Sequence, residues 1–534
     1  MNKILDAFPV DQKKQKSAGP MPLWGILIIC AIPILIAGLM SSASLGDEIH
    51  HYRFAKDCFL QKGRALFDSL YPSLTRPAIF YITDPAWPVL LSWIWRLFGR
   101  VSLAAAQIYH LGFYLLLFVS TYFGARHLYS REQAWWGTLL VATTPMIVSF
   151  SVLFYTDMPA TALVVLSFWL LLEKRVLAAG LMIGAAFLMK KTTVFFIPVG
   201  CLYLIYDARF KIPKALMALM AFGIPPAIMI FSEFAWRAHH FPASFDLGRE
   251  LIMRVDTIYK NDSAGMERGS GLGILTEWLK RTMSALKNNE FTNSNILSVF
   301  DQFKYLGMAL ITGLGLYFFR RKIQTRDLWL WGGILIYTAA IIFLRLLPDI
   351  RYLMPVIPFV CILAARPLAE SPGRIFRGAI LGLCALQLFS ASLYTGFQRR
   401  IPEGIQEGFR FMSAHTPPDA LILYPELNIL EYAGRRMVWG FFPIRTLFWG
   451  TEKEKLKTLK DARLNYIAVK KSRIYKDEGA NRHVGGYPQS FLDHMRQGSF
   501  AKQIFENEEM SVWEINPGLL EHAYAAISGK GDRA

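Results

Sequence analysis

Long apolar runs separated by short charged connections dominate the hydrophobic pattern of the chain. Eleven stretches contain no charged side chain: 22–45, 103–124, 133–156, 158–172, 176–189, 192–206, 215–232, 305–319, 328–344, 352–365 and 378–398. A helix needs about 20 apolar residues to cross a bilayer, and flanking lysines and arginines can extend a shorter run by reaching the headgroups. The pattern therefore predicts an α-helical polytopic membrane protein with about 11 transmembrane helices.

The run at 85–98, PAWPVLLSWIWRLF, departs from this pattern. It is short, interrupted by proline, rich in tryptophan and carries Arg96. An amphipathic helix of this kind is more typical of the membrane interface than of a span. We expect 85–98 to lie at the interface without crossing.

The basic residues support that choice. With the lysine-rich tail before residue 22 inside, the inner connections hold Arg126, Arg131, Lys174, Arg175, Arg209, Lys211, Lys214, Arg320, Arg321, Lys322, Arg326, Arg366, Arg374 and Arg377, while the short outer turns hold only Lys190, Lys191, Arg345 and Arg351. Basic residues gather in cytoplasmic loops, so this asymmetry predicts an N-in/C-out topology. The outer face then carries loops 46–102 and 233–304, Asp157, and the residues after about 399.

The composition agrees with a membrane protein. Hydrophobic residues make up 53% of the 534 positions, charged residues 18%, and the mean hydropathy is +0.30. The net charge of +18 would suggest nucleic acid in a soluble protein. No zinc-finger spacing or RNA-binding signature accompanies the charge, so we expect no nucleic-acid partner.

The tail from 399 to 534 changes character. ALILYP (420–425) and NYIAVKK (465–471) are typical of short buried strands, and the charged segment between them, EKEKLKTLKDARL, is helical in composition. QIFENEEMSVWEIN (503–516) predicts a hairpin. We therefore divide the chain into a transmembrane domain, 1–398, and a small exported α/β domain, 399–534.

An acidic pair, Asp47 and Glu48, directly follows the first apolar run in GDEIHHYRFAKDCF. A carboxylate at the mouth of a helix bundle can act as a general base, and it can bind a divalent metal together with His50 or His51. The alternative is an ordinary polar cap where a helix leaves the membrane. Because the charged and aromatic residues are packed so closely, we favour a functional role.

Further charged residues share the predicted outer face. Asp157 lies in a tight turn before Met158-Pro159, where it is a candidate functional group and also a good helix cap. Lys190, Lys191 and Arg351 interrupt apolar stretches on the same side. Such cations bind phosphate, although they can equally anchor a helix to lipid headgroups. Two separate sites on the face of the carboxylates favour an anionic lipid substrate.

Nucleotide-binding and protease motifs are missing from the sequence. It contains no GxxxxGK[ST] phosphate loop, no GxGxxG turn, no Asp-x-Asp pair and no HExxH. We therefore expect a substrate that is activated without a nucleotide. His110 and His127, lone histidines in or beside spans, are expected to be structural.

In this order, the motifs resemble the GT-C class of polytopic glycosyltransferases, and most closely the branch with protein O-mannosyltransferases and lipid A aminoarabinose transferases. The matching pieces are a first span followed by Asp47-Glu48, the segment DPAWPVLLSWIWRLFG, the Asp157-Met158-Pro159 turn, GLMIGAAFLMKKT and the late RYLMPVIPF, followed by an exported domain. Each motif is short, but together they span nearly the whole chain.

The resemblance implies an inverting transfer of a sugar from a polyprenyl or dolichyl phosphate to a lipid, glycan or protein acceptor. Asp47 would be the base and Glu48 would orient it or a metal. Asp157 would bind the acceptor or share the base role. The three cations Lys190, Lys191 and Arg351 would hold the leaving phosphate.

The remaining predicted site residues surround these groups. We expect the acceptor or the lipid to be bound by His50, His51, Tyr52, Arg53, Asp84, Trp87 and Tyr352. No cofactor is certain, and a divalent metal on Asp47, Glu48 and His51 stays open. Few exported cysteines and no retention signal favour a bacterial inner membrane, with the active site on the periplasmic face.

Two other functions share some of these features. A transporter or flippase of a lipid-linked anion would also use charges at the membrane, but transporter sites lie near the midplane of repeated halves, and no repeat is visible here. A non-catalytic assembly subunit would use the tail to bind partners and would tolerate the loss of Asp47.

Overall fold

A computed structural model describes residues 23–40, 46–60, 86–208, 211–240, 307–320, 327–343, 350–370, 373–424, 429, 432–438, 444–475 and 487–531. The chain forms two compact units, which are treated separately. The helical unit comprises Met1–Met40, Thr83–Trp87 and Ala104–Gly396, and the sheet unit comprises Ser41–Ile82, Pro88–Leu103 and Phe397–Ala534. The functional division at residue 399 stays a prediction.

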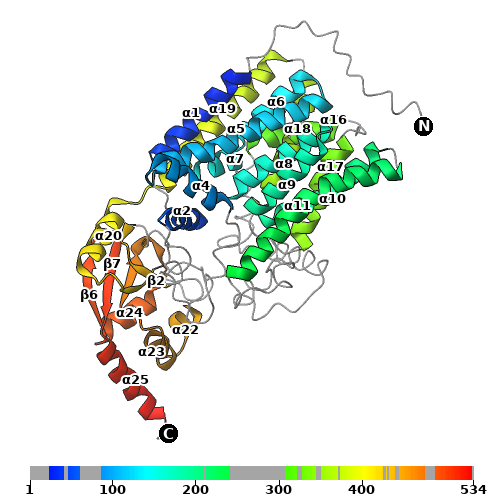
Figure 1. Ribbon diagram of the computed structural model, residues 1–534. Coiled ribbons are helices and arrows are strands. Elements are labelled where there is room, and N and C mark those ends of the chain that lie inside the picture. The colour runs from blue at the N-terminus through cyan, green and yellow to red at the C-terminus, as the bar shows by residue number, and fades with distance from the viewer. Residues whose placement is uncertain are drawn as a thin grey trace. The chain divides into compact units, whose positions relative to one another are not determined.

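The helical unit is a bundle of apolar helices (Figure 1). Its α-helices are α1 (Leu23–Leu39), α5 (Leu103–Leu128), α6 (Arg131–Thr143), α7 (Pro145–Val152), α8 (Asp157–Leu172), α9 (Val176–Met189), α10 (Phe196–Asp207), α11 (Ile212–His240), α16 (Met308–Arg320), α17 (Asp327–Phe343), α18 (Ile357–Glu370) and α19 (Arg374–Gln398). Two 3₁₀ helices, η3 (Lys191–Phe195) and η4 (Ile350–Val356), interrupt the pattern.

Each predicted apolar run coincides with a helix, or with the pair α6 and α7, which are bent by 54°. Among the described residues, four helices are long and apolar enough to cross a membrane, or up to five if the bent pair is one span. The four lie at Leu103–Leu128, Ile212–Ala235, Arg351–Glu370 and within Arg374–His415. The prediction of a mostly helical protein with several apolar helices is confirmed, whereas the count of eleven spans stays a prediction.

Small residues allow close helix packing in this unit. An added Cβ at Gly180 would lie 2.3 Å from the backbone oxygen of Phe222, and one at Gly184 would lie 2.9 Å from Pro226. Both contacts join α9 to α11, and their equal spacing shows that these helices run parallel. Glycine at such positions lets apolar helices approach each other through their backbones.

A buried polar network near Asp327, the first residue of α17, ties together three helices and the turn that follows α5. The Tyr129 hydroxyl donates to Asp327 Oδ1 over 2.6 Å, and Arg366 Nη1 donates to Oδ2 over 3.1 Å. The Tyr317 hydroxyl also donates to Oδ2, over 3.3 Å. Because each carboxylate oxygen has donors, the charge is compensated without water.

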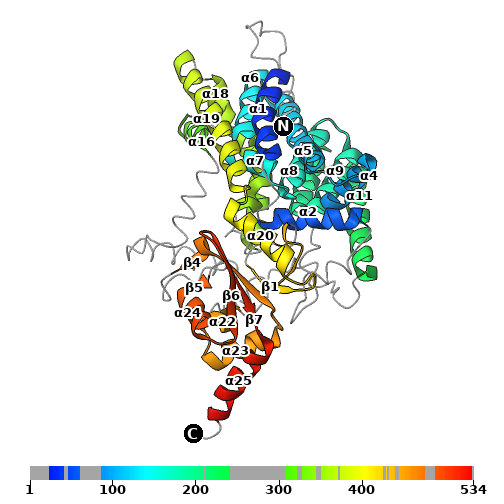
Figure 2. The same ribbon diagram turned by 90° about the vertical axis from the view of Figure 1, so that its left-hand side faces the viewer.

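The sheet unit, in which Figure 2 labels β1, β6 and β7, contains a five-stranded sheet. Its strand order is β2-β1-β3-β7-β6. The strands are β1 (Leu421–Leu423), β2 (Arg436–Val438), β3 (Tyr466–Lys470), β6 (Ala501–Glu506) and β7 (Met510–Ile515), and a second small sheet pairs β4 (Ile474–Tyr475) with β5 (Tyr487–Pro488). Strands β1, β2 and β3 are parallel, whereas β7 is antiparallel to both β3 and β6. The predicted strands at 420–425 and 465–471 and the predicted hairpin are therefore present.

Helices cover both faces of the five-stranded sheet. Alternate residues of β3, such as Ile467 and Ala468, belong to different apolar clusters, as the period of two in a strand requires. One cluster includes Phe409 of α20 (Glu403–His415), and the other includes residues of α23 (Glu452–Asp461), α24 (Gln489–Gln497) and α25 (Pro517–Gly531). The short helix α22 (Ile444–Trp449) joins the second cluster.

Two helices before residue 103 belong wholly or mostly to the sheet unit. Helix α2 (Gly46–Phe59) carries the acidic pair, and α4 (Ala86–Phe98) is the helix expected at the interface. On α4, Leu91 and Trp95 are fully buried, whereas Leu97 is 85% exposed. This one-sided burial agrees with an amphipathic helix, and its position in the membrane interface stays a prediction.

The start of α23 offers a test of the sheet unit. The Thr451 side chain accepts from the Glu454 backbone N–H, and the Glu454 carboxylate accepts from the Thr451 backbone N–H over 2.7 Å. These bonds from Thr451 hold the pKa of Glu454 below its ordinary value of 4.5. We expect Thr451→Ala to lower the free energy of unfolding by about 1 kcal/mol.

The pH dependence of this loss has a definite sign. A carboxylate with a lowered pKa contributes stability above its ordinary pKa and loses it as the pH falls. Thr451→Ala keeps the backbone bond to Glu454 and removes the bond that Thr451 Oγ1 donates to Glu454 Oε2 over 2.9 Å. Only the part of the stability difference that comes from this side-chain bond should therefore shrink below pH 4.5. Denaturant unfolding of the full chain, with Lys457→Ala on the same helix as the control, measures both effects. An equal loss in the control would contradict the capping role.

Candidate functional site

A buried ion pair between Asp157 and Lys190 is the centre of the charged cluster in the helical unit. Asp157 is the first residue of α8, and Lys190 lies in the extended break between α9 and η3. Lys190 Nζ donates to Asp157 Oδ1, and both side chains are less than a tenth exposed. Asp157 also suits the first turn of a helix, where a negative charge is stabilised. The predicted alternative, that Asp157 is the helix N-cap, is wrong: Thr156 holds the cap position, and Asp157 is the first residue inside α8.

Two aromatic rings bring a second cation to this pair. Lys190 Nζ lies 4.3 Å from the centre of the Tyr352 ring, and Arg351 Cζ lies 5.4 Å from the same centre. Arg351 Cζ also lies 5.3 Å from the Tyr155 ring. The faces of these rings attract cations. Lys190 and Arg351 therefore share the Tyr352 ring, and Lys190 also pairs with Asp157.

Polar groups next to this cluster were not predicted from the sequence. The Tyr337 hydroxyl donates to Thr192 Oγ1 over 3.2 Å, and the Tyr337 ring stacks on Phe196 with 4.6 Å between centres. Tyr155 was missed as well. The available signal was their position, since Tyr155 and Thr192 each stand two residues from a predicted site residue.

Lys191 has different surroundings from its neighbour Lys190. It is half-buried, and its Nζ lies 5.9 Å from the ring of Phe234 on α11. The break between α9 and η3 thus sends two adjacent lysines toward different rings. The predicted phosphate-binding role of Lys191 stays a prediction.

In the sheet unit, Glu48 forms a buried ion pair with Arg399. Arg399 Nη2 lies 2.6 Å from Glu48 Oε1, and Arg399 Nε donates to Oε2 over 3.1 Å. Both side chains are fully buried. Each carboxylate oxygen therefore meets a guanidinium nitrogen, an arrangement that fixes orientation as well as charge.

Other residues of α2 have mixed environments. Tyr52 is buried and meets the Trp95 ring edge-to-face at 5.3 Å, and Arg53 Nε lies 3.5 Å from Asp57 Oδ1. His51 is half-buried. Asp47 is the second residue of α2, but its side chain and that of His50 lie outside the described residues, as does Asp84.

Trp87 and His110 form a buried pair in the helical unit. Trp87 is fully buried, and its Nε1 donates to His110 Nδ1 over 3.2 Å. His110 Nε2 lies 2.8 Å from the Phe150 carbonyl oxygen, so it carries the proton and donates. With both ring nitrogens bonded, His110 has the structural role that we expected. The acceptor-binding role of Trp87 stays a prediction.

The structure thus brings together four predicted residues, Asp157, Lys190, Arg351 and Tyr352. Glu48, Tyr52 and Arg53 lie on α2 in the other unit, so a joint site stays a prediction. Within the described ranges, no three His, Cys, Asp or Glu side chains converge as metal ligands, and Asp47 is not among those described.

Comparison with known proteins identifies a family match for part of the chain. Residues 84–236 match the family described as dolichyl-phosphate-mannose-protein mannosyltransferase. This segment contains Asp157 and Lys190 but not the acidic pair on α2. No curated protein sequence matches the chain.

Solved structures share the fold at low sequence identity. The oligosaccharyltransferase of Archaeoglobus fulgidus with a tethered acceptor peptide has a TM-score of 0.56 at 12% identity, over 84% of this chain and 69% of that one. ArnT from Cupriavidus metallidurans, bound to undecaprenyl phosphate, has a TM-score of 0.55 at 12% identity, over 92% of this chain and 97% of that one. The archaeal AglB with an inhibitory peptide and dolichol phosphate has a TM-score of 0.50 at 12% identity, over 84% and 69%.

The family match and the shared fold agree with the resemblance to GT-C glycosyltransferases that the motifs show. Residues 84–236 thus match a family of mannosyltransferases, and the chain shares its fold with solved glycosyltransferase structures. The match extends over less than half of the chain, so the donor, the acceptor and the roles of individual residues are treated as proposals.

Proposed function

We propose that the protein transfers a sugar from a polyprenyl or dolichyl phosphate to a lipid, glycan or protein acceptor, with inversion at the anomeric carbon. The observation that carries this proposal is the buried Asp157–Lys190 pair beside Arg351, which lies partly in the family-matched segment. ArnT is bound to undecaprenyl phosphate and AglB to dolichol phosphate, which supports a lipid phosphate as the donor's carrier.

The cations would act on the leaving group. As the acceptor oxygen attacks the anomeric carbon, the bond to the phosphate oxygen breaks and that oxygen takes the electron pair. Lys190 and Arg351 would stabilise this charge, since fixed cations in a dry site act strongly on charge that develops in the transition state. Tyr352 would keep both cations in place.

The acidic residues would have separate roles. Asp47 would accept the proton of the acceptor hydroxyl as general base. Glu48 would orient α2, because both of its oxygens already meet Arg399. Asp157 would hold Lys190 and bind the acceptor. The eleven spans, the N-in/C-out topology and a periplasmic site in a bacterial inner membrane belong to this proposal.

A donor panel tests the function. Purified full-length protein in detergent would receive polyprenyl phosphate sugars with radiolabelled sugar, with membrane extract as acceptor and a nucleotide sugar as control. We expect free polyprenyl phosphate and labelled acceptor to form together with at least one lipid donor, and neither with the nucleotide sugar. The proposal would be overturned if no lipid donor supported transfer and the protein moved labelled lipid across the membrane of reconstituted vesicles. That result would identify a transporter instead.

A further inference from the structure

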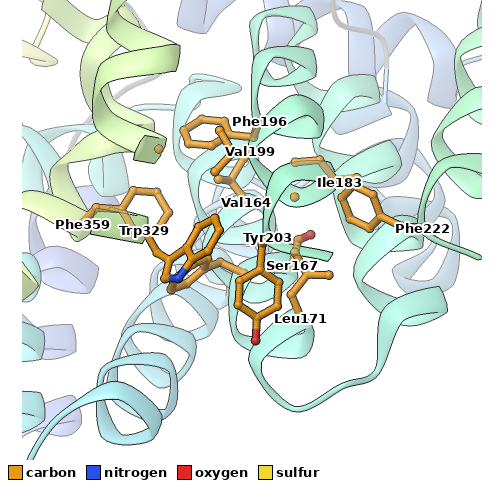
Figure 3. Close-up of a pocket in the computed structure, with 13 residues that line it drawn as sticks. Val164, Ser167, Leu171, Ile183, Phe196, Val199, Tyr203, Phe222, Trp329 and Phe359 are labelled. Carbon is orange, nitrogen blue, oxygen red and sulfur yellow. The ribbon is translucent and has the colours of Figure 1, made fainter. Parts of the chain in front are cut away.

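An apolar crevice lies in the helical unit, and its Phe196 end borders Tyr337, next to the charged cluster. Its empty space, including the part that is open to solvent, is about 450 Å³, and it is lined by residues of α8, α9, α10, α11, α17 and α18. Figure 3 shows Phe196 and Val199 toward one end and Tyr203 and Leu171 toward the other. Along α8, Leu171 is 14 residues from Asp157, or about 21 Å. This end of the crevice is therefore remote from Asp157.

The far end of the crevice has the residues of a membrane–water interface. The Trp329 ring meets Tyr203 at 5.3 Å and Tyr206 at 5.0 Å. Leu202 and Leu328, their chain neighbours, are more than half exposed. Tryptophan and tyrosine collect at headgroup level, where an apolar ring body and a polar edge are both accommodated.

Basic side chains surround the same end. Lys174 pairs with Asp207 and lies 5.5 Å from the Tyr203 ring centre. This pair joins the α8–α9 turn to the α10–α11 turn. Among the described residues of these turns, the exposed basic ones are Lys174, Arg175, Lys211 and Lys214, and the carboxylates are Glu173 and Asp207. Four cations against two carboxylates favour an anionic headgroup.

We infer that this crevice holds one acyl chain of an anionic phospholipid, whose headgroup lies among the basic residues of the two turns. In a bilayer, a crevice with apolar walls is filled by hydrocarbon in preference to water, because water would find too few polar partners there. The aromatic mouth and the positive charge fix which end the headgroup occupies. This lipid would sit in the leaflet opposite to the Asp157 end of α8.

Two adjacent glycines of α17 provide a matched pair of variants. A Cβ at Gly333 would lie 3.9 Å from Phe196 and from Val199, both in the crevice wall, so a larger side chain there would enter the crevice. A Cβ at Gly332 would have no neighbour within 4 Å. Gly333→Phe therefore fills the crevice, whereas Gly332→Phe adds the same bulk outside it.

Lipid retention by the full-length protein in detergent tests the inference. Native mass spectrometry would measure binding of phosphatidylglycerol and of phosphatidylcholine with the same acyl chains. We expect wild type to bind phosphatidylglycerol at least tenfold more tightly than phosphatidylcholine. Gly333→Phe should bind phosphatidylglycerol at least tenfold more weakly than wild type does, whereas Gly332→Phe should bind it as tightly as wild type. Gly333→Ala, which fits the space, should also match wild type.

A charge variant tests the headgroup separately from the crevice. Arg175→Gln, Lys211→Gln and Lys214→Gln together leave the Lys174–Asp207 pair intact. They should abolish the preference for phosphatidylglycerol while phosphatidylcholine binding stays within twofold. Equal binding by Gly333→Phe and wild type would overturn the inference, as would equal binding of the two lipids by wild type. Displacement of phosphatidylglycerol by undecaprenyl phosphate would assign the crevice to that lipid instead. None of these readouts requires sugar transfer, so they stand apart from the proposed activity.

Discussion

Replacing Lys190 with methionine is expected to lower the rate of sugar transfer by about 10²–10³-fold. Lys190 is buried against Asp157 and Tyr352, so its charge acts in a site from which water is excluded. Methionine keeps the length of the side chain but cannot compensate charge on the leaving phosphate. The measurement is single-turnover release of polyprenyl phosphate at saturating donor.

Lys191 supplies the matched control for this variant. Its Nζ faces Phe234 and the side chain is half-buried, so Lys191→Met removes the same charge one residue away. We expect its loss of rate to be at least tenfold smaller. Equal losses would show that the net charge of the segment matters, and that the Asp157 cluster does not.

A double variant distinguishes a loss of transfer that is caused by destabilisation of the fold from one that is caused by the missing charge at the phosphate. Lys190→Met alone leaves Asp157 buried beside a neutral side chain, which destabilises the fold. Lys190→Met with Asp157→Asn removes both charges and is expected to recover the unfolding temperature without recovering transfer. Recovery of transfer in the double variant would contradict the role of Lys190 at the phosphate.

The apolar pattern predicted the helices of the chain well, because burial in a bilayer demands long apolar runs. Each of the eleven runs coincides with a helix or a bent pair of helices. The strands at 420–425 and 465–471 were predicted for a similar reason, since strands buried on both faces are apolar throughout. β2 was missed, because three residues carry too little periodicity.

The helical nature of α2 was also not predicted. Its charged residues drew attention, although Ile49, Tyr52 and Ala55 are buried at three-residue spacing. That spacing is the signal of a helix with one buried face. Within the loop 46–102 the sequence predicts one helix, at 85–98, and the structure describes α2 in addition to it.

The pairings between charges could not be predicted from the sequence. Lys190 and Asp157 stand 33 positions apart, and Glu48 and Arg399 stand 351 apart. Arg366 was counted only as a topology signal, whereas it binds Asp327 in a buried network. A charge pattern predicts which face of a membrane a residue occupies, but the partner depends on how distant helices pack.

Replacing Arg399 with methionine is expected to lower the free energy of unfolding by about 3–5 kcal/mol. Glu48 and Arg399 are both fully buried, so the variant leaves a carboxylate without its cation and without water. Denaturant unfolding in detergent, followed by circular dichroism, measures the loss. Arg399→Met combined with Glu48→Leu removes both charges and should recover most of the stability, since apolar replacement of a buried pair is often neutral.

Asp47→Asn is the control that separates stability from chemistry on α2. It leaves the Glu48–Arg399 pair in place, so we expect the unfolding free energy to stay within about 0.5 kcal/mol of wild type. Transfer should nevertheless fall by about 10²–10⁴-fold, the range for loss of a general base. The opposite pattern, full transfer in Asp47→Asn and a stable but inactive Glu48→Leu/Arg399→Met protein, would move the base from Asp47 to Glu48. Because Arg399 would then hold the catalytic carboxylate in its charged form, that outcome would also assign the arginine to the reaction.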